Sequence, residues 1–172
     1  EKSPDYIANR TDEEAHADMR ELLDRLRRRP GVEAGRMSQN SFPYNGSNSG
    51  MDVRLDTMES KYNIRRWVTP DFFRVFRYQG ANGETPEQLA ALLKEGTFMV
   101  SRNVFESRYK IDLKDYVGKE FCLDQDTAHL SKLVAALQVV RYDDFSSGAY
   151  SRSAVILLPE NRLASGNEIC LR

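Results

Sequence analysis

Apolar residues recur at helical spacing near the start of the chain. Between 11 and 29 they stand three or four residues apart, which is typical of one face of a helix: Ala15, Met19, Leu22, Leu23 and Leu26. Thr11 and Glu14 have the spacing of a capping box, which satisfies backbone N–H groups at a helix start. Three arginines in the last turn interact favourably with the helix dipole, and Pro30 ends the pattern. The sequence therefore predicts a helix over 11–29.

Three further helices are predicted along the chain. Residues 56–67 favour a helix that ends at a Thr-Pro pair. Thr85 begins a second helix with a proline at its first position and a glutamine at its third, which completes a capping box. A third helix is predicted to follow Asp126 or Thr127. Its apolar face would consist of Leu130, Leu133, Val134 and Leu137.

Strand patterns lie between and after these helices. The segments FFRVFRY (72–78) and TFMVS (97–101) each favour a strand. The segment AVILLP (154–159) is apolar throughout, which is typical of a central strand buried on both faces. A last short strand is predicted over 167–172. Because the order is not a regular βαβ alternation, we expect an α+β protein with N-terminal helices followed by a mixed, split β-sheet.

The length and net charge of the chain limit the classes of protein to which it can belong. The 172 residues are enough for one domain with a hydrophobic core. We divide them into an N-terminal helix with a Ser-, Asn- and Gly-rich polar arm (1–50) and a main domain (51–172), packed as one compact unit. A formal net charge of −1 offers no basic field for nucleic acid. No stretch approaches the ~20 apolar residues of a membrane span.

Few residues are suited to redox or metal chemistry. Cys122 and Cys170 fit reduced, buried thiols better than a disulfide framework. His16 and His129 are too few for a histidine-rich metal site, so no metal is expected, and His129 is expected to face solvent. The sequence begins with glutamate and lacks a signal-peptide pattern, so it is expected to be part of a longer protein.

An arginine at the end of an apolar segment is the first candidate for chemistry. Arg77 follows Val75 and Phe76, and a turn with Gly80 comes soon after. A guanidinium group can bind two phosphate oxygens at once, which a lysine cannot copy. Two interpretations of Arg77 therefore stay open: a clamp for an anion in a cleft, or a rim arginine paired with a carboxylate.

Three short motifs give a family resemblance. The segment YNIRRWVTPDFFRVFRYQG (62–80) resembles the arginine motif of mono-ADP-ribosyltransferases, with Arg77 at the arginine position. Phe145-Ser146-Ser147 stands at that family's Phe-x-Ser-Thr-Ser motif. Gly166-Asn167-Glu168 stands at its Glu-x-Glu motif, with the first glutamate missing. The run RYDDFSS, with Asp144, is similar to the aspartate-bearing form in type III secreted effectors of plant pathogens.

This resemblance implies a function and a set of site residues. It implies a sheet of ADP-ribosyltransferase type and the transfer of ADP-ribose from NAD to a host protein. Arg77 would hold a phosphate or ribose of NAD, with Ser146 and Ser147 at the nicotinamide ribose. Glu168 or Asp144 would stabilise the oxocarbenium-like cation, a task that suits a carboxylate.

The resemblance also implies a bacterial effector that is secreted into the host cell. We expect a monomer with no membrane partner and no nucleic acid. Whether the site is active stays open, and the alternative is a catalytically inactive module that binds a host partner through the same fold. Ser146, Ser147 and Asp144 also fit an ordinary turn, in which such residues hydrogen-bond the local backbone.

Overall fold

The computed structural model describes residues 11–33, 35–38, 50–54, 59, 61–138, 155–159 and 168–172. Its elements in chain order are α2 (Asp12–Arg27), β1 (Gly35–Ser38), β2 (Gly50–Arg54), β3 (Lys61–Val68), α3 (Asp71–Phe76), α4 (Pro86–Leu92), β4 (Thr97–Ser101), α5 (Arg102–Tyr109), the 3-10 turn η1 (Leu113–Asp115), β5 (Glu120–Leu123), β6 (Leu130–Leu137), β7 (Val155–Pro159) and β8 (Glu168–Leu171). The protein is therefore of the expected α+β class, and its sheet is mixed.

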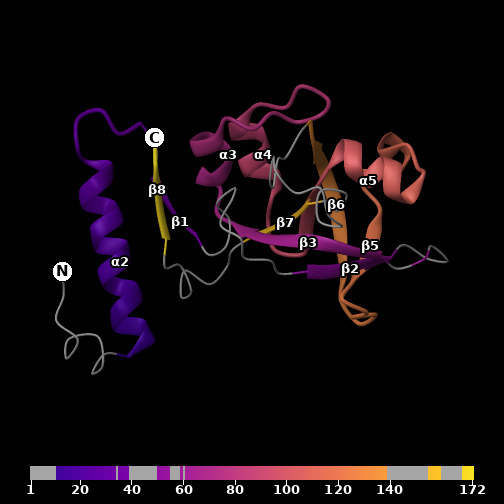
Figure 1. Cartoon of the computed structure of the whole chain (residues 1–172), viewed down its shortest axis with the longest axis horizontal. Helices are drawn as coiled ribbons and strands as arrows, with labels where there is room; N and C mark the ends of the chain where they lie inside the picture. The colour runs from indigo at the N-terminus through magenta and orange to yellow at the C-terminus, as the bar shows by residue number, and fades with distance from the viewer. Residues whose placement is uncertain are drawn as a thin grey trace, which may run out of the picture.

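Six strands close into a barrel in the order β2-β3-β7-β4-β6-β5. The β3–β7 and β4–β6 pairs are parallel, and the other pairs of the barrel are antiparallel. Strands β1 and β8 form a separate antiparallel sheet with α2 beside it, away from the barrel (Figure 1). The expected split sheet of ADP-ribosyltransferase type is thus not supported, because the six strands close on themselves.

Strand β4 and the second half of strand β6 are buried on both faces. Alternate residues of β4 enter different apolar clusters: Phe98 lies with residues of β2, α5 and β5, whereas Met99 lies with residues of β3, α3 and α4. In β6, the neighbours Ala136 and Leu137 belong to the first and the second cluster, respectively. Successive side chains of a strand point to opposite faces, so one face of this pair packs against α5 and strands β2 and β5, and the other against β3, α3 and α4.

Several locally specified elements form as predicted. Both capping boxes are present, with Thr11 paired to Glu14 at the start of α2 and Thr85 paired to Gln88 at the start of α4. The apolar strand β7 is central, as predicted, because it pairs with β3 on one side and β4 on the other. Cys122 is a buried free thiol, which also agrees with the sequence analysis.

Two elements around Pro70 differ from the sequence prediction. The segment predicted as a helix over 56–67 contains strand β3, which pairs with β2 and β7. The segment predicted as a strand over 72–78 is mostly helix α3, and Phe72 stacks on Tyr78 with ring centroids 5.1 Å apart. These segments are short, so packing against distant parts of the chain outweighs their local preference.

The segment after Asp126 is also a strand rather than a helix. Asp126 does cap the backbone, but it accepts bonds from the N–H groups of Ala128 and His129 in a turn that leads into β6. The apolar spacing of β6 fits a helix in sequence, yet its second half is buried on both faces and so needs apolar residues at consecutive positions. Periodicity alone cannot separate these two cases.

Shortening a buried side chain of β6 should destabilise the protein. Leu133 has no exposed surface, so Leu133→Ala is expected to lower the free energy of unfolding by about 2–5 kcal/mol. Leu130, in the same strand, is 48% exposed, and Leu130→Ala should change it by about 0.5 kcal/mol or less. Urea denaturation of both variants checks this. Equal losses would contradict the described burial.

Candidate functional site

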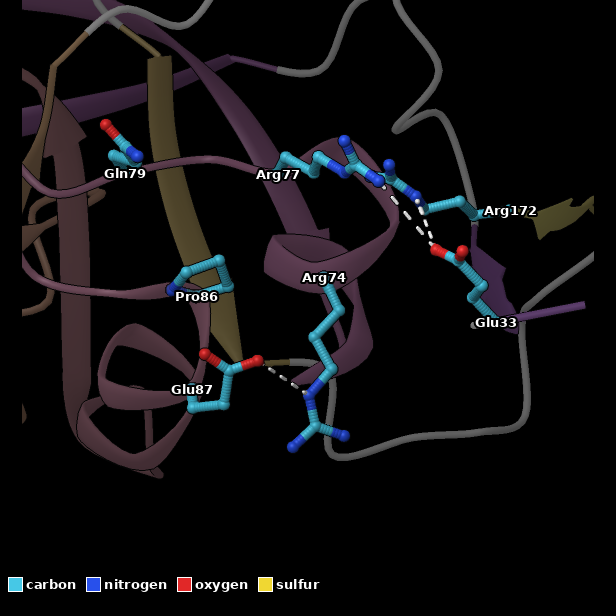
Figure 2. Close-up of a pocket in the computed structure, with 7 residues that line it drawn as sticks. All are labelled: Glu33, Arg74, Arg77, Gln79, Pro86, Glu87 and Arg172. Atoms are coloured by element: carbon cyan, nitrogen blue, oxygen red, sulfur yellow. Dashed lines mark ion pairs between the residues drawn. The ribbon is translucent and has the colours of Figure 1, made fainter.

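A cleft of about 430 Å³ lies between the barrel side of the molecule and the β1–β8 sheet (Figure 2). Its walls come from the segment between α2 and β1, from α3 and the residues after it, from the start of α4, and from the end of β8. Its lining residues are Glu33, Arg74, Arg77, Gln79, Pro86, Glu87 and Arg172. Three guanidinium groups thus face two carboxylates, which leaves an excess of one positive charge.

Arg77 enters this cleft from the end of helix α3. Its backbone is left-handed, with φ 51° and ψ 38°, and its N–H lies 3.3 Å from the carbonyl oxygen of Arg74. A non-glycine residue in this conformation costs about 1–2 kcal/mol. The helix therefore ends at Arg77, and the guanidinium group extends into the cleft rather than along a strand (Figure 2).

Glu33 is shared by two arginines. Its Oε2 lies 3.3 Å from Nε of Arg172 and 3.8 Å from Nη2 of Arg77. The side chains of Arg77 and Glu33 are 70% and 71% exposed, so this pair contributes at most about 1 kcal/mol. If Arg77 is a rim arginine paired with a carboxylate, that carboxylate is Glu33.

Arg74 belongs to a second set of charges at the same end of α3. It lies 3.7 Å from Glu87 and 3.5 Å from Asp71. Asp71 is in turn held by Arg27 of helix α2 at 2.6 Å, and Arg27 also donates two hydrogen bonds to the carbonyl oxygen of Gly35. These contacts join α2, β1 and α3, and they hold the two sides of the cleft together.

The other predicted site residues are not assembled around Arg77 in the described structure. Asp144, Ser146 and Ser147 lie outside the described residues, as does most of the polar arm. Glu168 is the first residue of β8 and pairs with Ser38. It lies four residues from Arg172, or about 13 Å along an extended strand. The catalytic roles given to these residues remain predictions.

Sequence reasoning missed a polar network inside the barrel. Asn63 is fully buried, and its Nδ2 donates to the hydroxyl of Tyr109 at 2.9 Å. That hydroxyl donates to the carbonyl oxygen of Val53 at 3.1 Å. The network joins β3, α5 and β2, so this asparagine of the supposed arginine motif serves the barrel core. A polar residue at an inward position of a strand was the signal that could have revealed it.

The remaining candidates for chemistry are on the surface. His129 faces solvent, as predicted, and its ring Nδ1 lies 3.0 Å from Asp126. The hydrogen bond with this ring, followed by the backbone N–H groups of Ala128 and His129, lowers the pKa of the exposed Asp126 carboxyl. Among the described residues, no three His, Cys, Asp or Glu side chains are grouped as metal ligands, and no helix is long and apolar enough to span a membrane.

Comparisons with known proteins identify the fold. No family model and no curated protein matches the chain. The extracellular domain of the ABC-type transporter YknZ from Gram-positive bacteria is 12% identical, with a TM-score of 0.54 over 88% of this chain and 71% of that one. A domain of a protein proposed to be a permease, from Porphyromonas gingivalis, is 16% identical, with a TM-score of 0.55 over 83% of this chain and 56% of that one.

These likenesses overturn the resemblance to mono-ADP-ribosyltransferases. The chain has the fold of an extracellular transporter domain and of a permease domain, so the assignments as an ADP-ribosyltransferase and as an inactive effector module are wrong. Secretion into a host cell is wrong for the same reason. The expectations of NAD as a ligand, of a host protein partner and of a monomer are not tested by these findings.

The backbone of Arg77 gives a prediction about stability. Glycine adopts φ 51° without steric cost, whereas alanine does not. Arg77→Gly and Arg77→Ala both remove the weak pair with Glu33, so they should differ only in the backbone term. We expect the glycine variant to be more stable by about 1 kcal/mol in urea denaturation. An alanine variant of equal or greater stability would contradict the left-handed conformation.

Proposed function

We propose that this chain is an extracytoplasmic domain of a permease of the ABC-transporter class. In this proposal it is joined to membrane-spanning segments outside these 172 residues and offers binding surfaces beyond the membrane. The observation that carries the proposal is the likeness to the extracellular domain of YknZ, which covers 88% of the chain. The matched part is longer than the barrel, so it includes more than a common barrel motif.

The placement of the first and last elements supports this proposal. Helix α2 and strand β8 lie together at one end of the molecule, while the barrel extends from the other end (Figure 1). Strand β8 pairs with β1, which packs against α2. A domain inserted between two membrane segments is expected to have its first and last elements on the same side, because the chain must return to the same surface.

The contacts between α2, β1 and β8 are close, as expected of a base that carries the barrel. The β1–β8 sheet is extended by a hydrogen bond of 2.7 Å from the N–H of Glu33 to the carbonyl oxygen of Arg172. The side chains of Leu23 and Leu171 approach Gly35 of β1 so closely that a Cβ at this glycine would lie within about 3.0 Å of both. In the proposal, this close packing holds the two ends of the domain together.

A labelling experiment tests the proposed location. Glu95 is exposed, so Glu95→Cys in the full-length protein gives a thiol that a membrane-impermeant maleimide can reach. We expect the protein in the membrane fraction and equal labelling of this cysteine in intact and lysed cells. The unmutated protein, which carries Cys122 and Cys170, gives the background labelling. Labelling only after lysis, or recovery in the soluble fraction, would contradict the proposal.

A further inference from the structure

The shared carboxylate of Glu33 leaves two arginines with few partners. Arg77 reaches it from the end of α3, and Arg172 reaches the same oxygen from the end of β8 (Figure 2). Within the described part of the chain, this carboxylate is the charged partner of both guanidinium groups, at 3.8 and 3.3 Å. Each guanidinium has five N–H donors in a fixed plane, so one carboxylate satisfies few of them.

The electrostatics of this group favour an additional anion. Two positive charges that converge on one negative charge repel each other, and the repulsion is reduced when another anion lies between them. Paired arginines bind tetrahedral oxyanions well because each guanidinium can contact two oxygens. Arg74 adds a third positive charge to the lining, although Glu87 and Asp71 lie close to it.

The backbone places Arg77 and Arg172 beside the cleft, and the side chain of Glu33 can rotate away from them. The backbone of Arg77 is fixed by the end of α3, and that of Arg172 by its bond to the backbone of Glu33. The side chain of Glu33 is 71% exposed, so it can rotate into solvent without loss of that backbone bond. The cleft of about 430 Å³ then leaves room for a phosphate-sized group next to the two guanidinium groups.

We propose that Arg77 and Arg172 form a binding site for a phosphate-type oxyanion, with Glu33 as a built-in competitor. In the free protein the Glu33 carboxylate occupies the position of the ligand. A bound phosphate group displaces it and takes hydrogen bonds from both guanidinium groups. The phosphate group can belong to a free anion or to a lipid headgroup, because both present the same oxygens. This inference does not depend on the proposed function.

Three substitutions separate this site from a purely structural ion pair. Arg77→Gly keeps the left-handed backbone and Arg172→Gln keeps a similar size, and each should weaken phosphate binding by about ten-fold, the loss expected for charge-assisted hydrogen bonds. Glu33→Gln removes the competitor and should strengthen binding by several-fold. Arg28→Gln, an exposed arginine outside the cleft, should leave it unchanged.

The experiment is a titration of the 172-residue chain with inorganic phosphate at low ionic strength, followed by NMR chemical shifts. A parallel arm measures sedimentation with phosphatidylglycerol vesicles and with phosphatidylcholine vesicles. Saturable phosphate binding without vesicle binding identifies a free anion, and vesicle binding that both arginine substitutions weaken identifies a lipid headgroup.

Two results would overturn the proposal. The first is the absence of saturable binding in both arms. The second is an equal response of Glu33→Gln and Arg77→Gly, because a structural ion pair loses the same contact in either variant, whereas a competitor and a ligand residue act in opposite directions. Thermal unfolding of each variant confirms that the fold is intact.

Discussion

The burial of strand β4 and of the second half of β6 on both faces is the constraint on which the other elements depend. Phe98 and Met99 are neighbours in β4, yet they enter different apolar clusters, and neither has exposed surface. Each buried side chain of this kind contributes about 1.5–3 kcal/mol. Helix α5 and strand β5 are needed to cover one face, and helices α3 and α4 the other. Residues 71–92 therefore fold as helices α3 and α4 because these helices cover the apolar side chains of β4 and β6.

The end of α3 shows how this packing produces the candidate site. Phe72 and Phe73 hold the helix against the barrel, and the left-handed backbone of Arg77, directly after the helix, then directs its side chain into the cleft. The same helix carries Asp71, which holds Arg27 of α2. Burial on one side and ion pairs on the other thus place charged residues from distant parts of the sequence around one cleft.

The resemblance to mono-ADP-ribosyltransferases failed because its residues serve the fold. Asn63, in the supposed arginine motif, completes a buried hydrogen-bond network with Tyr109. Arg77 ends a short helix instead of a strand. The apolar run of β7 is what any central strand requires when it is paired on both sides. Short motifs in the right order can therefore arise from packing needs, without the chemistry of the family.

The sequence alone determined the elements that short-range interactions specify. The capping boxes at Thr11 and Thr85 bring donors and acceptors together within one helical turn, so both helix starts could be predicted. Only the tertiary structure decided that 61–68 and 130–137 are strands, because pairing with distant strands outweighs helical spacing. The approach of Arg77 to Arg172 was equally hidden, since it depends on how β8 pairs with β1 and how α3 packs on the barrel.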